Sequence, residues 1–274
     1  MNSNKDVFMF LKEYIRKKLN NFLIDSTELK NRCDVLLTQI DYLTNYNYKK
    51  NKVLYTCITG GYEALLLQEY LNPEWDYVCF TDSEKLLRYK NYGAWSIKPL
   101  EFCELDNTRN NRWHKTHPHV LFPDYKESIY IDGNIIFTDN QIFNEILNKK
   151  QSLVIPKHWK DDCIYNEIEN VRENAFDTKE NLLKIKEFLQ NNNFPVHYGL
   201  NENNLIYRVH NERNVIKIMD EWWTFIRDYS KRDQLSLAYV LWKNGIKPSD
   251  IEIKNLRDRA KLNRGGVLFK THKK

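Results

Sequence analysis

The strongest constraint on the fold is an alternation of strand-like and helix-like segments that starts at residue 53. The strand-like segments are short, rich in β-branched and aromatic residues, and bounded by turn residues. They cover residues 53–58, 76–80, 95–99, 128–137, 152–155 and 205–209. The helix-like segments repeat apolar residues every three to four positions and cover residues 109–121, 178–191, 213–229 and 233–243. This order predicts an α/β fold with a mostly parallel sheet.

The first 50 residues have a different pattern and are predicted to form a helical extension. Apolar residues recur every three to four positions from residue 5 to about 48, with a break near Asp25, so two helices are expected. The chain therefore divides into an extension of residues 1–50 and a domain of residues 51–274. The first helix has a basic flank that consists of Lys12, Arg16, Lys17 and Lys18. It is either an ordinary packed helix, which could also mediate a homodimer, or a peripheral contact with an anionic membrane surface.

Composition argues against several classes of protein. With 274 residues, 42% of them hydrophobic, the chain can bury a large core and is not expected to be disordered. The net charge of +5 is mild and the basic residues are spread out, so no nucleic-acid partner is expected. Five cysteines without a CxxC pair or a signal peptide indicate a reducing cytoplasm. The apolar run at residues 7–11 is too short for a signal core or a membrane span. We therefore expect a soluble cytoplasmic protein, with peripheral contact at the inner face of the membrane as an alternative.

Polar residues gather at the downstream ends of three predicted strands. The first strand is followed by Thr59, Gly60, Gly61 and Tyr62, the second by Thr81 and Asp82, and residues 128–137 contain Asp132, Gly133 and Asn134. Each group has an ordinary explanation: Gly-Gly as a turn, Asp82 as a strand-end cap, and Asp-Gly as a two-residue β-hairpin turn. Ligands of α/β sheets bind beyond the carboxyl ends of the strands, so three such groups in succession predict one shared cleft.

The residue types in this cleft suit a nucleotide diphosphate and a divalent cation. Gly60 and Gly61 would let a nucleotide lie against the backbone, and Asp82 could accept hydrogen bonds from a ribose or a base. Arg109, Arg112 and Lys115 lie close to one helix face, as either a solvated basic face or a pyrophosphate clamp. Asp132 and Asn134 offer hard oxygen ligands for Mg²⁺ or Mn²⁺. A zinc site at His114, His117 and His119 fits less well, because Pro118 interrupts the helix and no cysteine lies nearby.

A series of motifs over roughly 200 residues resembles one protein family. The motifs are Tyr55-Thr56, Gly60-Gly61-Tyr62, residues 79–82, 109–115, 118–119, 121–125 and 128–134, His158, residues 163–165, Gly199-Leu200, Trp222-Trp223 and residues 229–236. The resemblance is to a glycosyltransferase-like domain, formerly catalogued as a domain of unknown function, with plant mucilage and cell-wall proteins and bacterial members. It implies a nucleotide-sugar-dependent GT-A fold, which is Rossmann-like, with a mixed, mostly parallel sheet flanked by helices. Asp132-Gly133-Asn134 takes the place of its Asp-any-Asp metal motif, with Asn134 in place of the second carboxylate.

Sugar transfer also needs groups that neutralise the leaving diphosphate and, in an inverting enzyme, a base near the acceptor hydroxyl. Asp233 is the first candidate base, although a helix N-cap explains it equally well. Arg232 could pair with Asp233 or hold phosphate. His158 could bind acceptor or phosphate, or be a surface-loop histidine. His272 could add a metal or diphosphate ligand, or belong to a basic tail.

The predicted function is therefore that of a hexosyltransferase in polysaccharide biosynthesis. It would use a nucleotide-diphosphate sugar as donor, a glycan or lipid-linked glycan as acceptor, and Mn²⁺ or Mg²⁺ to stabilise the leaving diphosphate. The alternative is a non-catalytic carbohydrate- or nucleotide-binding module on a degenerate transferase fold, which Asn134 would favour. A phosphohydrolase or nucleotidyltransferase would usually have a denser acidic cluster.

Overall fold

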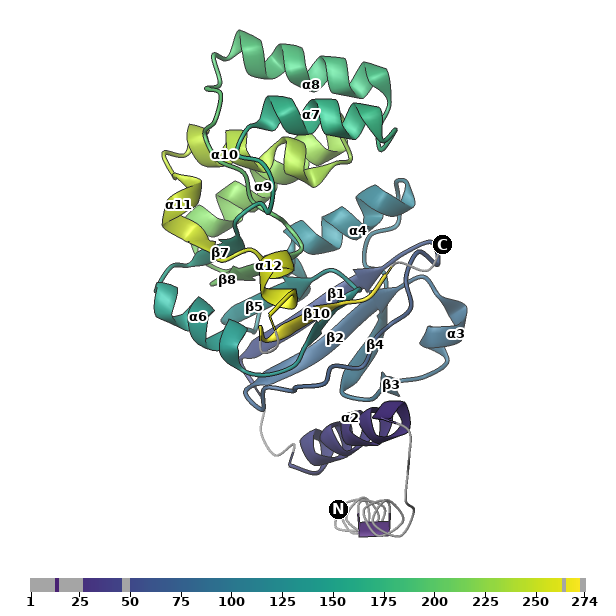
Figure 1. Cartoon of the computed structure of the whole chain (residues 1–274). Coiled ribbons are helices and arrows are strands. Elements are labelled where there is room, and N and C mark those ends of the chain that lie inside the picture. Colours follow the sequence, from purple (N-terminus) through teal and green to yellow (C-terminus); the bar gives the residue numbers. More distant parts are fainter. Residues whose placement is uncertain (1–12, 15–26, 46–49, 263–264, 272–274) are drawn as a thin grey trace.

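The computed structural model describes residues 13–14, 27–45, 50–262 and 265–271. Its centre is an eight-stranded mixed sheet with the strand order β3-β4-β2-β1-β5-β8-β7-β9 (Figure 1). The strands are β1 (Lys52–Ile58), β2 (Trp75–Thr81), β3 (Asn91–Tyr92), β4 (Trp95–Pro99), β5 (Glu127–Ile131), β7 (Leu153–Pro156), β8 (Leu205–Arg208) and β9 (Glu252–Ile253). The four neighbouring strands β4, β2, β1 and β5 are parallel, whereas β8 runs antiparallel to β5 and β7. The predicted α/β class, with a mixed, mostly parallel sheet, is confirmed.

Helices flank this sheet and also form a separate group at one end (Figure 1). They are α2 (Thr27–Thr44), α3 (Glu84–Leu87), α4 (Asn107–Thr116), α5 (Pro118–Leu121), α6 (Gln141–Lys149), α7 (Ile164–Glu173), α8 (Lys179–Asn191), α9 (Arg213–Asp228), the 3₁₀ turn η1 (Asp233–Leu235), α10 (Leu237–Lys243), α11 (Pro248–Ile251) and α12 (Leu256–Ala260). The sequence patterns located α8, α9 and α10 but did not predict α6 or α7. The predicted helix 109–121 is two helices, because Pro118 starts α5 as its first residue.

Alternate residues of the central strands face two different cores. On β1, Leu54 and Ile58 belong to a core completed by α6 and α12, while Val53, Tyr55 and Cys57 belong to a core completed by α9 and α10. Since both faces are covered, β1 and β2 are buried along almost their whole length. A third core joins α7, α8 and α10. The sheet is therefore a rigid platform, and its strand ends can hold a site in fixed geometry.

Residues 128–137 do not form the hairpin that the Asp-Gly sequence allowed. The main chain turns at 132–134, where the Ile135 amide donates to the Asp132 carbonyl at 3.1 Å. The strand β6 (Ile135–Phe137) then leaves the main sheet and pairs antiparallel with β10 (Val267–Phe269). The main-sheet neighbour of β5 on this side is β8 instead. The turn therefore lies at the end of a central strand and places Asp132 at the carboxyl edge of the sheet.

Helix α2 makes up most of the described part of the predicted extension, and it packs against the α/β domain. Tyr42 is buried and its hydroxyl donates to the Trp75 carbonyl at 2.7 Å. Gln39 donates to the Gln68 carbonyl and accepts from the Ala94 amide. The basic residues of the first predicted helix, Lys12, Arg16, Lys17 and Lys18, lie outside the described residues, so membrane contact and dimerisation stay predictions. Within the described ranges, no helix is both long and apolar enough to cross a membrane.

Candidate active site

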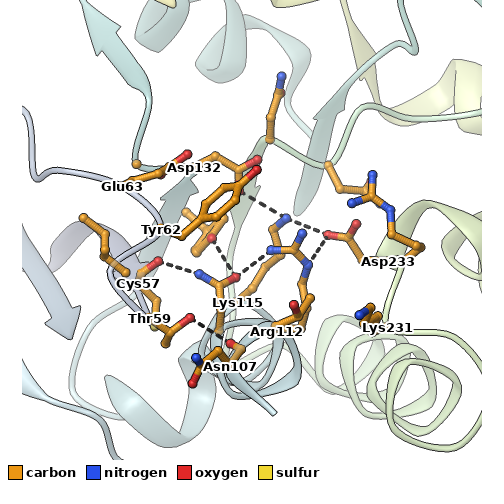
Figure 2. Close-up of a pocket in the computed structure, with 18 of the residues that line it drawn as sticks. Cys57, Thr59, Tyr62, Glu63, Asn107, Arg112, Lys115, Asp132, Lys231 and Asp233 are labelled. Atoms are coloured by element: carbon orange, nitrogen blue, oxygen red, sulfur yellow. Dashed lines mark hydrogen bonds and ion pairs between the residues drawn. The ribbon is translucent and has the colours of Figure 1, made fainter. Parts of the chain in front are cut away.

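A cavity of about 590 Å³ opens at the carboxyl ends of β1 and β5 (Figure 2). Five parts of the chain far apart in sequence build its wall. They are the loop after β1, one face of α4, the turn after β5, and the segments 202–204 and 231–234. The cavity also contacts Phe176 and Arg257. Its position is the one expected for ligands of a parallel sheet.

The cavity collects most of the residues that the sequence indicated. Those on its wall are Thr59, Gly60, Tyr62, Arg112, Lys115, Asp132, Gly133, Arg232 and Asp233. Gly61, Asp82, Arg109, Asn134 and His158 do not line it, and His272 lies outside the described residues. The Asn134 carbonyl accepts from the Lys270 amide, and the His158 ring accepts from the Asp161 amide at 3.0 Å. A cavity therefore lies where the polar residues at the strand ends predicted a cleft.

The loop after β1 is shaped by two residues outside it. Gly60 has φ +63°, and a Cβ there would lie 2.3 Å from Nδ2 of Asn107, so only glycine fits. Its amide donates to Oδ2 of Asp82 at 2.7 Å. Asp82 therefore acts here by fixing the Gly60 backbone at the cavity mouth.

Helix α4 directs two cations into the cavity. Asp106 caps the helix by accepting from the Thr108 and Arg109 amides. Arg109 then pairs with Asp106 at 2.7 Å and donates to the Ile226 carbonyl, which ties α4 to α9. Arg112 and Lys115 follow on the side that lines the cavity. The predicted basic row is therefore split between packing and the site.

Lys115 is the centre of a buried ionic network. Its ammonium lies 2.6 Å from Oδ2 of Asp233 and 3.4 Å from Oδ1 of Asp132, and its side chain is only 1% exposed. Arg112 Nε approaches the same Asp233 oxygen at 3.1 Å. Burial by itself would raise the pKa of Asp233, but Arg112 and Lys115 outweigh it and hold that pKa at about 2. Asp233 is thus an ionised, weakly basic carboxylate that orients two cations.

The segment that carries Asp233 is anchored on both sides. Asp177 accepts from the Ser230 hydroxyl at 2.6 Å and from the Lys231 amide at 3.2 Å. The Trp222 ring donates to the Asp233 carbonyl at 2.9 Å. Arg232 lies over the Phe176 ring, with its guanidinium carbon 5.0 Å from the ring centroid. Lys231 and Arg232 therefore reach the cavity from a fixed backbone.

Several wall residues were missed by sequence reasoning. They are Glu63, Asn107, Asn111, Phe176, Glu202, Asn203, Asn204, Lys231, Gln234 and Arg257. Glu63 and Lys231 adjoin predicted site residues, so proximity in sequence could have indicated them. The segment 202–204 precedes a strand and carries no metal motif. Only the pairing of β8 with β5 brings it to the cavity.

Two wall carboxylates fit the protein part of a divalent-cation site. Asp132 has 31% of its side chain exposed, and a Cβ on Gly133 would lie 2.3 Å from Oε2 of Glu63. Glu63 therefore lies against the glycine that follows Asp132 (Figure 2). Mg²⁺ is often bound by one or two carboxylates together with phosphate oxygens. Over the described part of the chain, no cluster of three His, Cys, Asp or Glu side chains could hold a metal, so substrate would have to complete the shell.

Histidines on or near α4 are shielded from solvent, and we expect them to make the stability of the protein fall in acid. His114 donates from Nδ1 to the Asn110 carbonyl and accepts at Nε2 from the Glu101 amide, so protonation would break the second bond. Burial lowers its pKa to about 4, and the pKa values of His117 and His210 are lowered to about 4 in the same way. Between pH 6.5 and about 4 the unfolded state binds more protons than the folded state, so stability falls as pH falls through this window.

We expect the titration of His114 alone to lower the free energy of unfolding by roughly 3 kcal/mol as the pH falls from 6.5 to about 4. Urea denaturation at pH 7 and pH 4 measures the loss. In His114→Gln, where the amide can still accept from Glu101, the difference between the two pH values should shrink. An unchanged difference would contradict this assignment.

A family comparison identifies the class of protein. The model of the TOD1/MUCI70, glycosyltransferase-like domain matches residues 76–262, which is more than half of the chain. The chain belongs to this family, as its motifs predicted. The matched segment starts in β2, so the loop at residues 59–62 precedes it. No curated protein sequence matches the chain.

Solved glycosyltransferase structures share a distant similarity with the chain. Mouse xyloside xylosyltransferase 1 has a TM-score of 0.44 at 10% identity, over 81% of this chain and 97% of the other. The bifunctional glycosyltransferase WbbM has a TM-score of 0.42 at 11% identity, over 76% of this chain and 39% of the other. The mannosyltransferase Ktr4p of S. cerevisiae has a TM-score of 0.37 at 9% identity, over 83% of this chain and 79% of the other. The chain thus spans about two fifths of the length of WbbM.

Proposed function

We propose that this glycosyltransferase-like chain transfers a hexosyl group from a nucleotide-diphosphate sugar to a glycan or lipid-linked glycan acceptor. The observation that carries the proposal is the buried network in which Asp233 holds Arg112 and Lys115 beside Asp132. Oriented cations in a site shielded from water stabilise the charge that develops on a leaving diphosphate. The family membership supports the same class of reaction.

In this proposal each part of the wall has one task. The nucleotide lies against the Gly60 backbone. Arg112 and Lys115 bind the diphosphate, and Lys231 and Arg232 neutralise the rest of its negative charge. Asp233 positions Arg112 and Lys115. It does not serve as the general base in this proposal, because a carboxylate with a pKa of about 2 binds a proton from the sugar-accepting hydroxyl too weakly. Mn²⁺ or Mg²⁺ held by Asp132 and Glu63 would supply further charge stabilisation to the leaving diphosphate.

The alternative of a non-catalytic binding module has less support. It depended on Asn134 as a missing metal ligand, and Asn134 does not line the cavity. The position of Glu63 offers a second carboxylate from another loop. The acceptor, the cytoplasmic location, peripheral membrane contact and a homodimer stay predictions from the sequence.

Binding of nucleotide diphosphates is the direct test. Thermal unfolding is followed with UDP, GDP, CDP and their sugars, each with and without Mn²⁺. We expect at least one of them, at about 100 times its Kd, to raise Tm by about 5 °C or more. Arg112→Met should abolish the shift. Arg172→Met, which removes a half-exposed arginine of α7, should keep it. If all these ligands leave Tm unchanged, the proposed function is wrong.

A further inference from the structure

Residues 201–204 form a run of four buried polar side chains immediately before β8. Asn201, Glu202, Asn203 and Asn204 are 4%, 3%, 3% and 6% exposed. The backbone of this segment is fixed to neighbouring strands. The Glu202 amide donates to the Pro156 carbonyl, and the Asn204 carbonyl accepts from the Asp132 amide, both at 2.9 Å. The segment is therefore held rigidly beside Asp132, at the end of β5.

Buried polar side chains normally have hydrogen-bond partners, but this segment departs from that rule. Among the described residues, neither side-chain amide atom of Asn203 has a hydrogen-bond partner. The Asn204 amide lies beside the Glu202 carboxylate. Oε1 of Glu202 is paired with Nε of Arg257 at 2.5 Å. Glu202, Asn203, Asn204 and Arg257 all line the cavity. Unpaired buried groups on a cavity wall point to a ligand that supplies their partners.

The chemistry of these groups selects a class of ligand. A carboxamide both donates and accepts, which matches the hydroxyl groups of a sugar ring. Arg257 is already paired with Glu202, and an anionic sugar would meet the carboxylates of Glu202 and Asp132. In a nucleotide-diphosphate sugar the ring is bonded directly to the diphosphate. The ring must therefore lie close to Asp132 and to the two cations, Arg112 and Lys115, that bind the diphosphate.

We propose that Asn203 binds the hydroxyl groups of a neutral donor sugar. This inference rests on the proposed function, because it places the ring next to the diphosphate bound by Arg112 and Lys115. It goes further by separating a sugar subsite from the diphosphate subsite. Removal of the subsite should weaken binding of the sugar and leave binding of the nucleotide diphosphate unchanged.

The experiment measures calorimetric affinities of wild type and Asn203→Leu for a nucleotide diphosphate and for its sugar, using UDP with UDP-glucose and GDP with GDP-mannose. Leucine has a similar shape and removes an unpaired amide, so Tm should stay the same or rise. Affinity for the sugar nucleotide should fall about tenfold, while affinity for the diphosphate alone should stay within about twofold. Asn203→Ala is the second variant if leucine prevents folding. Asn201→Ala is the matched control, because Asn201 is equally buried but does not line the cavity.

The outcomes separate the two proposals. If wild type binds none of UDP, GDP and CDP nor any of their sugars, the proposed function fails and this inference fails with it. If both diphosphate and sugar nucleotide lose affinity equally, or neither does, the sugar subsite is wrong while the proposed function stands. A comparison of UDP-glucose with UDP-glucuronate, or of GDP-mannose with GDP-mannuronate, tests the charge of the sugar. Tighter binding of the uronate would overturn the neutral class.

Discussion

Replacement of Lys115 by methionine is expected to destabilise the protein by about 3 kcal/mol and to lower sugar transfer at least about 100-fold. Lys115 is 1% exposed and is ion-paired with both Asp233 and Asp132. Without Lys115, the buried Asp233 carboxylate still has Arg112 as a partner. The loss of stability is therefore expected at the low end of the range for a broken buried ion pair. Transfer falls because one cation that faces the diphosphate is gone.

Thermal unfolding and single-turnover transfer measure the two effects, and Tm should fall by about 10 °C. Lys186→Met is the control. Lys186 pairs with Glu169 at 2.9 Å, and the two side chains are 37% and 39% exposed. That variant should lose less than about 1 kcal/mol and keep its activity. A Lys115→Met protein with wild-type turnover would contradict the role of the network.

Asp132→Asn is expected to lower transfer by about 100-fold to 1,000-fold while the fold is retained. Its side chain is 31% exposed and Lys115 keeps its shorter ion pair with Asp233, so little stability is lost. If Asp132 and Glu63 hold a cation, Mn²⁺ should no longer strengthen nucleotide binding in Asp132→Asn. The affinity measured without metal should stay close to that of wild type. Glu63→Gln should have the same kind of effect.

Initial rates and nucleotide affinities, each measured with and without Mn²⁺, test this prediction. Asp139→Asn is a suitable control, because Asp139 hydrogen-bonds Gln141 and does not line the cavity. Retention of wild-type turnover by Asp132→Asn would exclude Asp132 from the reaction. Loss of nucleotide affinity in the absence of metal would instead assign Asp132 to direct nucleotide binding.

Local patterns were sufficient for much of the fold. Uninterrupted apolar strands such as β1 and regular apolar faces such as those of α8 and α9 follow from side-chain periodicity. The pairing of residues 128–137 could not be obtained in this way. An Asp-Gly sequence between apolar runs suits a hairpin, and only the distant strand β10 draws β6 out of the main sheet. A pattern within ten residues contains no information about a partner more than a hundred residues away.

The candidate site, like the fold, could be predicted only in part from local sequence patterns. By itself, the sequence determined the α/β class, the family, and the strand ends at Gly60 and Asp132, because these depend on short-range periodicity and local motifs. The tertiary structure alone decided that Lys115 and Arg112 share Asp233, that Arg109 joins the packing of α4, and that Asn203 faces the cavity. Those roles depend on distances across the fold, and such distances are set by how the strands pair and the helices pack.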